Sequence, residues 1–297
     1  MPTEESGLPL WPLVDVVVHD DAQYADVVRR WLGAVRTLAP NLWQRHEQTP
    51  APAVVERDET YTPWDQIGPP GGAFARLAVV QRRPSNPAAS RACSEAGWAW
   101  LDGELAGRPV RVAAILKALD SQGCANDGEL WLAVETADDE PDRLQLTAFC
   151  RVNDPDADAR SPVFLRRWFS LIAEVAGVAE PVFGYLGGFP QFGSTELDVS
   201  LHRLPDDSVA QGRELLRGFS WLTMVPAALA ERLGGSAGLR SSGAFVRVDE
   251  LPDGAVLLVA TDTPAEYDDA AVHRVFNALA PVLPADALEA MQRATDY

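Results

Sequence analysis

The chain has 297 residues, of which 43 are acidic and 25 basic, so its net charge is −18 and its pI is near 4.5. This charge disfavours nucleic acid and anionic membranes as partners, because both would repel the chain. Hydrophobic residues make up 47%, which is typical of a globular protein with an apolar core, and the length fits one large domain or two small ones.

The beginning of the sequence is acidic, and no stretch of about 18 apolar residues occurs anywhere. We therefore expect no signal peptide, no transmembrane helix and a cytoplasmic location. Cys93, Cys124 and Cys150 are widely spaced and form no CxxC pair, which predicts reduced thiols.

The first elements are a predicted strand at residues 14–18 and a helix over residues 24–38, where apolar side chains recur at helical spacing. Asp20 or Asp21 is in place to cap this helix, and Pro40 is expected to end it.

Residues 41–73 are rich in proline, glycine and polar residues, which predicts a long connection with room for a short helix or strand. The pattern then predicts a strand at residues 74–83, a short helix at 110–119 and a strand at 129–136.

In the second half, a strand is predicted at residues 144–152, followed by a helix with Ser161 as cap and Pro162 at its first position. Residues 183–189 contain three glycines and predict a loop. Residues 196–204 alternate apolar and polar side chains, which predicts a half-buried strand.

The segments at residues 29–32 (Arg-Arg-Trp-Leu) and 166–169 (Arg-Arg-Trp-Phe) resemble each other and lie about 137 residues apart, each in a predicted helix. Two interpretations remain open. One is a duplicated β-α-β-β unit, and the other is chance similarity between two amphipathic helices.

Residues 234–238 match the G-x-S-x-G pattern of serine hydrolases, with His273 downstream. A nucleophile elbow needs a strand before the serine, however, and the residues before Ser236 have the composition of a helix. The four histidines share no metal-ligand spacing, and Asp154, Asp156 and Asp158 lack the glycine and glutamate of a calcium loop. The sequence predicts no metal site and no cofactor.

The C-terminal part contains the segment Phe-Ser-Trp-Leu-Thr at residues 219–223 and predicts a helix ending at Leu233-Gly-Gly. A hairpin with a Pro-Asp-Gly turn and a closing helix follow. These segments resemble the C-terminal part of bacterial immunity proteins associated with type VI secretion and polymorphic toxins. The resemblance covers residues 140–283 and departs at residues 264–269, where a helix begins instead of a glycine-containing turn.

The resemblance implies a non-catalytic antitoxin that binds a cognate toxin domain and occludes its active site. A basic nuclease would be a suitable toxin, because complementary charges speed association with an acidic protein. The alternatives are a serine hydrolase using Ser236 and a structural component of a secretion or phage-like system.

We expect an α+β fold with an antiparallel or mixed sheet and helices on at least one face. It would be arranged as two lobes at residues 1–140 and 141–297 or as one compact domain. The predicted partner-binding residues lie in acidic loops, where charge would steer a basic partner. They are Asp138, Asp139, Glu140, Asp154, Asp156, Asp158, Asp206 and Asp207.

Overall fold

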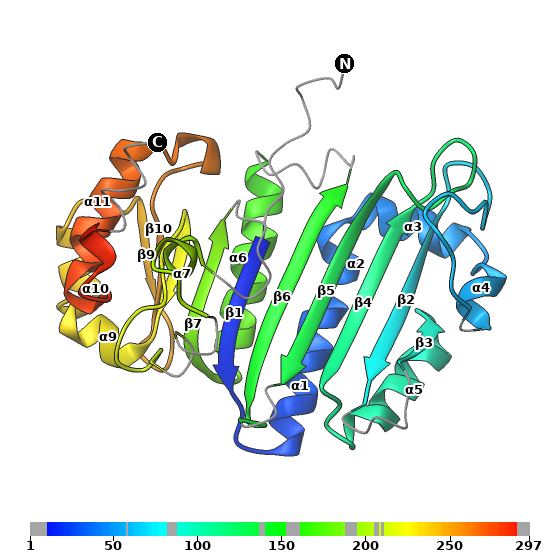
Figure 1. The fold of residues 1–297 in the computed structure, drawn as a ribbon, viewed down its shortest axis with the longest axis horizontal. Helices are drawn as coiled ribbons and strands as arrows, with labels where there is room; N and C mark the ends of the chain where they lie inside the picture. Colours follow the sequence, from blue (N-terminus) through cyan, green and yellow to red (C-terminus); the bar gives the residue numbers. More distant parts are fainter. Residues whose placement is uncertain are drawn as a thin grey trace. The chain divides into compact units, whose positions relative to one another are not determined.

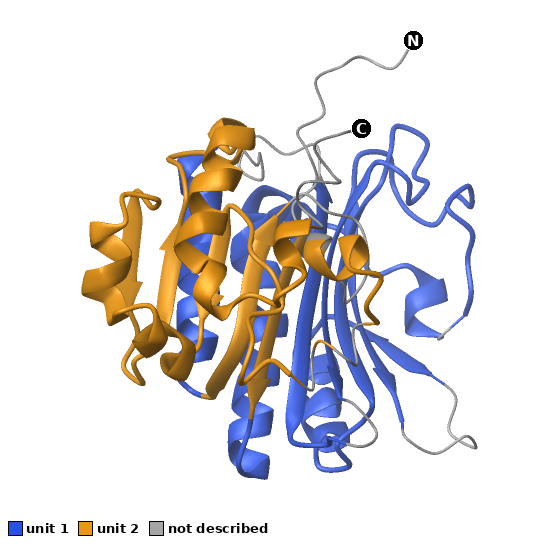
Figure 2. Cartoon of the chain, turned by 60° about the vertical axis from the view of Figure 1, so that its left-hand side comes forward, with its two compact units in different colours: residues 1–9, 18–178 blue, residues 10–17, 179–297 orange. Residues whose placement is uncertain are grey.

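The computed structural model describes residues 11–57, 59–81, 88–136, 140–152, 161–187, 195–204, 208 and 211–289. Its strands pair antiparallel, which confirms the predicted α+β fold. The chain divides into two compact units (Figure 2). Unit 1 comprises residues 1–9 and 18–178, and unit 2 comprises residues 10–17 and 179–297. The predicted arrangement, with lobes at residues 1–140 and 141–297 or one compact domain, stays a prediction.

The sheet of unit 1 has the strand order β3-β2-β4-β5-β6 (Figure 1). Its strands are β2 (Ala73–Val80), β3 (Ala89–Ala92), β4 (Arg111–Ala118), β5 (Gly128–Thr136) and β6 (Arg143–Val152). Leu130, Leu132 and Val134 of β5 are buried on one face, and Trp131 on the other face is only half-buried. The strand at residues 129–136 and its predicted facing are therefore confirmed.

Six helices of unit 1 lie among the described residues. They are α1 (Asp21–Gly33), α2 (Val35–Leu38), α3 (Pro40–Gln48), α4 (Ala53–Glu56), α5 (Glu95–Leu105) and α6 (Pro162–Ala176). The predicted cap of α1 is Asp20, whose carboxylate accepts the Gln23 N–H at 2.8 Å. Trp31 of α1 and Trp168 of α6 are fully buried with ring centroids 6.2 Å apart, so they join the two helices.

One prediction in this unit is wrong. Residues 110–119 form strand β4 instead of a helix, because β2 and β5 pair with both of its edges, and this pairing overrides the helix preference of its alanines.

The predicted end of the first helical segment before Pro40 is confirmed, because α2 ends at Leu38 and Ala39 leaves the helical conformation. Pro40 then occupies the first turn of α3, where its missing N–H costs no hydrogen bond.

The described residues of unit 2 form five strands in the order β1-β7-β8-β10-β9. They are β1 (Trp11–Val17), β7 (Glu180–Gly187), β8 (Leu222–Val225), β9 (Arg247–Glu250) and β10 (Val256–Val259). Its helices are α7 (Glu196–Ser200), α9 (Ala227–Arg232), α10 (Gly235–Ser241) and α11 (Asp269–Leu279), with 3₁₀ turns η2 (Pro264–Glu266) and η3 (Ala280–Val282).

β8 begins at Leu222, directly after Trp221, and the helix, hairpin and closing helix that follow agree with the sequence patterns. Gly234 ends the helical run after α9 with φ +83°, and Gly254 sits in the hairpin turn with φ +89°. β10 pairs with β9 as the predicted hairpin requires; it lies between β8 and β9, and all four of its residues are buried. α11 packs Val275, Phe276 and Leu279 into the core of this unit.

Two predictions in unit 2 are also wrong. The segment predicted as a glycine-rich loop at 183–189 contributes to strand β7 through Gly187; residues beyond it lie outside the described part. Gly184 suits the strand because a Cβ there would come within 3.1 Å of Met224. The segment 196–204, predicted as a strand, begins with helix α7, because Thr195 and Asp198 form a capping box.

A fully buried ion cluster lies in unit 2. The Arg217 guanidinium donates to Asp15 at 2.5 Å, to Asp198 at 3.3 Å and to the Ser208 hydroxyl at 3.0 Å. It also lies 5.4 Å from the Phe183 ring. All three charged side chains are at most 1% exposed, so a substrate has no access to them and the cluster has a structural role.

Candidate functional site

An exposed tryptophan marks the candidate site. Trp64 is 78% exposed and belongs to the loop at residues 59–67, beside the turn at residues 120–127. We call these two segments the Trp64 surface. A large aromatic side chain left this open to water is a typical anchor of a protein interface.

Hydrogen bonds hold the backbone beneath Trp64 in place. The Trp64 carbonyl accepts the Cys124 thiol at 3.2 Å, and Gln66 forms a β-bridge with Cys124. The Ile67 N–H donates to the Gly123 carbonyl at 3.0 Å. Gly123 has φ +82°, and a Cβ there would lie 2.1 Å from the Gly68 carbonyl oxygen, so this close approach requires glycine. The loop therefore presents Trp64 from a fixed backbone.

A small apolar cluster supports the loop from inside unit 1. Its buried members are Val55, Phe74, Leu119 and Ala125. Tyr61 packs edge-on against Phe74 with ring centroids 5.7 Å apart, and burial raises the pKa of its hydroxyl, so Tyr61 is neutral at physiological pH. The Trp64 surface is thus fastened to the sheet at β2.

Both segments of the Trp64 surface carry carboxylates, Asp65 in the loop and Asp120 in the turn. The Asp120 carboxylate accepts two backbone hydrogen bonds, from the Cys124 N–H at 2.9 Å and from the Gln122 N–H at 2.8 Å. These hydrogen bonds hold the pKa of Asp120 below its usual range. Burial raises the pKa of the Cys124 thiol, and the charges of Asp120 and Asp65 raise it further. Both carboxylates therefore contribute to the negative potential at Cys124. The surface combines an aromatic anchor with negative charge.

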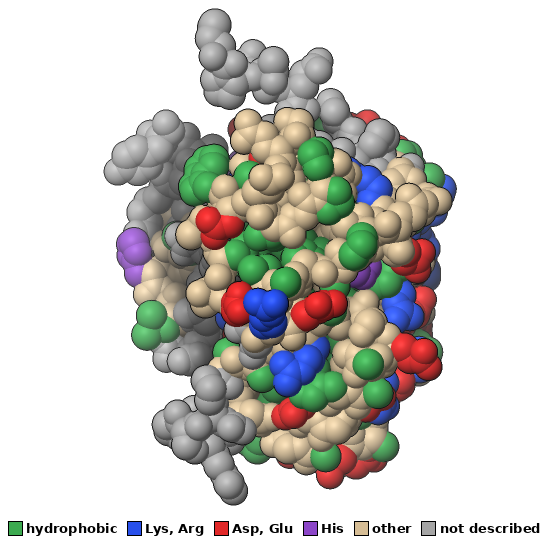
Figure 3. All heavy atoms as spheres, turned by 90° about the vertical axis from the view of Figure 1, so that its right-hand side faces the viewer, with side chains coloured by type: hydrophobic (Ala, Val, Ile, Leu, Met, Phe, Trp, Pro, Cys, Tyr) green, Lys and Arg blue, Asp and Glu red, His purple; other side chains and the backbone are tan. Residues whose placement is uncertain are grey.

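Acidic, basic and apolar side chains are interspersed on the side of unit 1 that carries α4 and β3 (Figure 3). Exposed carboxylates of the Trp64 surface are Glu59, Asp65 and Asp127, with Arg57 close to Glu59 at 3.8 Å. Such mixed polar surroundings around an exposed aromatic residue are typical of a protein interface with a polar rim.

His46 lies inside unit 1 and links α3 to the sheet. Its Nδ1 accepts the Ala75 N–H at 3.1 Å, and its Nε2 lies 3.3 Å from the Cys93 carbonyl. Burial lowers the pKa of His46, against opposing contributions from Cys93 and Glu47. The ring is therefore neutral, with its proton on Nε2, and is part of the fold.

This histidine predicts a pH dependence. Because the folded pKa lies below the unfolded value of about 6.5, protons bind the unfolded chain more readily. The His46 contribution to stability is complete above pH 6.5 and is lost as the pH falls below it. Urea titrations between pH 7.5 and 5 should show a smaller loss for His46→Gln than for the wild type. His273→Gln, at an exposed position, is the control, and equal slopes in all three proteins would contradict the prediction.

Of the predicted partner-binding residues, Glu140 lies in the described part of the chain. It is 50% exposed and 3.5 Å from the Arg143 guanidinium. The other seven lie outside the described residues, namely Asp138, Asp139, Asp154, Asp156, Asp158, Asp206 and Asp207. The predicted acidic contact surface stays a prediction.

Ser236 lies in the first turn of α10, directly after helix α9, so the strand that a nucleophile elbow requires does not precede it. Its hydroxyl donates to Glu250 at 2.6 Å and accepts from Arg240 at 3.2 Å. His273 is exposed on α11, with Nδ1 against the Asp269 carbonyl. The local context of the hydrolase alternative is therefore not met at Ser236.

The described residues contain no group of three or more His, Cys, Asp or Glu side chains that could hold a metal ion. Cys93, Cys124 and Cys150 are buried and form no disulfide, and burial raises the pKa of Cys93 to about 12. Nor does the described part include a helix with the length and apolar character needed to cross a bilayer.

Comparisons with known proteins give one structural similarity. No family model matches the chain, and no curated protein matches it. The solved structure of Pseudomonas aeruginosa T6SS protein PA0821 is similar, with 12% sequence identity and a TM-score of 0.47 over 92% of this chain and 73% of that one. None of these comparisons assigns the chain to a family.

The sequence contained a signal for Trp64 that the acidic-loop prediction did not use. Trp64 follows Thr62 and Pro63 in a segment without apolar periodicity, so no helix or strand offers it a buried face. A tryptophan in such a segment is a candidate for exposure.

Proposed function

We propose that the chain is a non-catalytic immunity protein that binds a basic toxin domain through the Trp64 surface. The observation that carries the proposal is Trp64 itself, 78% exposed on a hydrogen-bonded loop that also carries Asp65 and lies beside the turn with Asp120. A fixed loop loses little conformational freedom on binding, which favours affinity.

Charge supports a basic partner. A net charge of −18 attracts a positively charged protein over several ångströms and raises the association rate, while the aromatic anchor slows dissociation. The resemblance of the C-terminal segments to immunity proteins supports the choice of a toxin as that partner. A nuclease fits it well, because its substrate-binding cleft is positively charged.

The first experiment tests the function. The gene next to that of this chain is cloned with and without it, and survival of the host is measured. Protection together with a stoichiometric complex on size-exclusion chromatography is expected. If the neighbouring product is toxic and this chain neither binds it nor protects the host, the immunity function is wrong.

The second experiment tests the surface. Trp64→Ala should raise the dissociation constant for the toxin domain about 30-fold, because an aromatic anchor contributes about 2 kcal/mol or more. Val246→Ala removes an apolar side chain that is 56% exposed in unit 2 and should leave the affinity unchanged. Equal affinities of Trp64→Ala and wild type would place the contact elsewhere.

A third experiment measures association and dissociation rates, and so separates long-range electrostatic attraction from the contact that Trp64 makes in the complex. Glu59→Gln with Asp65→Asn should slow association and flatten its dependence on salt, with little change in the dissociation rate. Both side chains are exposed, so the pair should not affect folding. Leu204→Ala tests the alternative surface, because Leu204 is 67% exposed and adjoins the predicted acidic loop with Asp206 and Asp207.

A further inference from the structure

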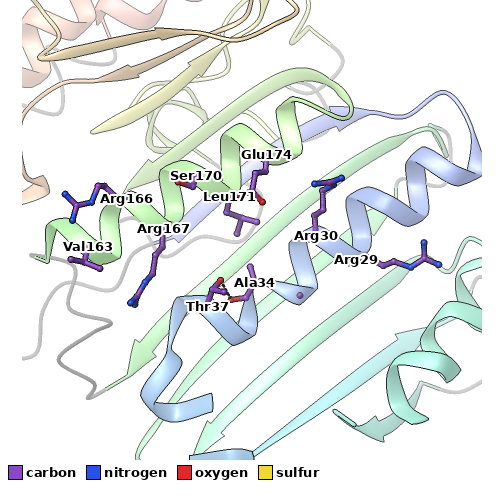
Figure 4. Close-up of a pocket in the computed structure, with 11 residues that line it drawn as sticks. Arg29, Arg30, Ala34, Thr37, Val163, Arg166, Arg167, Ser170, Leu171 and Glu174 are labelled. Atoms are coloured by element: carbon purple, nitrogen blue, oxygen red, sulfur yellow. Dashed lines mark hydrogen bonds between the residues drawn. The ribbon is translucent and has the colours of Figure 1, made fainter. Parts of the chain in front are cut away.

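A groove lined by arginines lies between α1, α2 and α6 in unit 1 (Figure 4). Its volume is about 690 Å³, which is within the range of small-molecule sites. Its lining residues are Arg29, Arg30, Gly33, Ala34, Thr37, Val163, Arg166, Arg167, Ser170, Leu171 and Glu174. The groove is independent of the Trp64 surface, since the two share no residue.

The two walls of the groove correspond in sequence. Each lining residue of α1 and α2 has a counterpart on α6 at the same separation of about 137 residues, so Arg29 and Arg30 correspond to Arg166 and Arg167. Both sets follow the i, i+3, i+4, i+7 spacing of one helix face. The similar segments of the sequence thus form two facing walls, joined below by the contact between Trp31 and Trp168.

The charge of the groove is opposite to that of the chain. Four arginines and one acidic residue, Glu174, are among its lining residues, in a chain with net charge −18. Arg29 pairs with Asp102 at 2.7 Å and Arg30 with Asp26 at 2.9 Å, but these pairs are 40–49% exposed and therefore weak. Arg166 is exposed and has no ion-pair partner among the described residues. Arg29, Arg30 and Arg166 can therefore turn to a ligand at little cost.

We propose that this groove binds a small organic ligand that carries phosphate or carboxylate groups. Guanidinium groups donate two parallel hydrogen bonds to such oxyanions, and the Thr37 and Ser170 hydroxyls add further donors. Ala34, Val163 and Leu171 give the groove an apolar part for the carbon skeleton. Long polyanions are disfavoured, because they would extend over the acidic remainder of the surface.

Isothermal titration calorimetry with pyrophosphate and with citrate tests the site and separates the two ligand chemistries. Binding of pyrophosphate alone indicates a phosphate compound, binding of citrate alone a carboxylate, and binding of both an oxyanion site of broad specificity. Arg30→Gln with Arg167→Gln removes one guanidinium from each wall. It should weaken binding at least about tenfold, because charge-assisted hydrogen bonds are lost.

The matched control is Arg57→Gln with Arg247→Gln, which removes the same charge from exposed arginines outside the groove and should leave affinity nearly unchanged. Glu174→Gln should tighten binding, because it removes a repelling carboxylate from the groove. Thermal unfolding checks that each variant is folded. The proposal is overturned if neither probe binds at about 10 mM. It is also overturned if the control weakens binding as much as the groove pair, or if Glu174→Gln has no effect.

Discussion

Arg217→Met is expected to lower the free energy of unfolding by about 3–5 kcal/mol, because it leaves the buried carboxylate of Asp15 without a counter-charge. The Asp198 carboxylate keeps a hydrogen bond after this substitution, because it also accepts the Thr195 N–H at 2.9 Å in the capping box of α7. Urea denaturation at pH 7, followed by circular dichroism, measures the loss.

A second substitution tests this explanation. Asp15→Asn should recover part of the stability in the Arg217→Met background, because a neutral amide needs no counter-charge, yet should destabilise the wild type. Arg247→Met is the control, since that side chain is 48% exposed and should change stability by less than about 0.5 kcal/mol. A loss below about 1 kcal/mol in Arg217→Met would mean that the buried carboxylate is not left uncompensated.

Trp168→Ala is expected to cost about 3–5 kcal/mol, because it opens a large cavity between α6 and the sheet. Trp31→Ala should cost a similar amount and additionally loses the hydrogen bond from its indole N–H to the Thr147 carbonyl at 3.2 Å. Thermal and urea unfolding of both variants check this prediction.

The double variant measures the contact between the two rings. The double variant should lose an amount of unfolding free energy that differs from the sum of the two single-variant losses by about 0.5–1.5 kcal/mol, because the ring centroids lie 6.2 Å apart. Trp64→Ala is the matched control, with an expected change within about 0.5 kcal/mol for an exposed ring. If Trp64→Ala were as destabilising as the core variants, it could not serve to test partner binding.

Elements with a strong local signal were predictable. Asp20 capped α1 as expected, the buried residues of β5 alternated as predicted, and the Pro-Asp-Gly hairpin formed with Gly254 at positive φ. In each case one or two residues favour a single backbone conformation, so the neighbours in space need add little.

Elements decided by pairing were not predictable. Residues 111–118 have an alanine-rich, helix-compatible sequence but lie between β2 and β5, and residues 180–187 became a strand between β1 and β8. The reverse happened at α7, where one capping box outweighed an alternating pattern. Local propensity is worth tenths of a kcal/mol per residue, so a full set of strand hydrogen bonds or a good cap overrides it.

The candidate sites likewise combine features that the sequence determines with features that depend on the tertiary structure. The sequence by itself determined the acidity, the α+β class and the existence of two similar Arg-Arg-Trp segments. Only the tertiary structure decided that those segments face each other across one groove and that Trp64 stands exposed on a tethered loop. Charge and periodicity are properties of the chain, whereas a groove or an exposed anchor depends on which segments, distant in sequence, pack together.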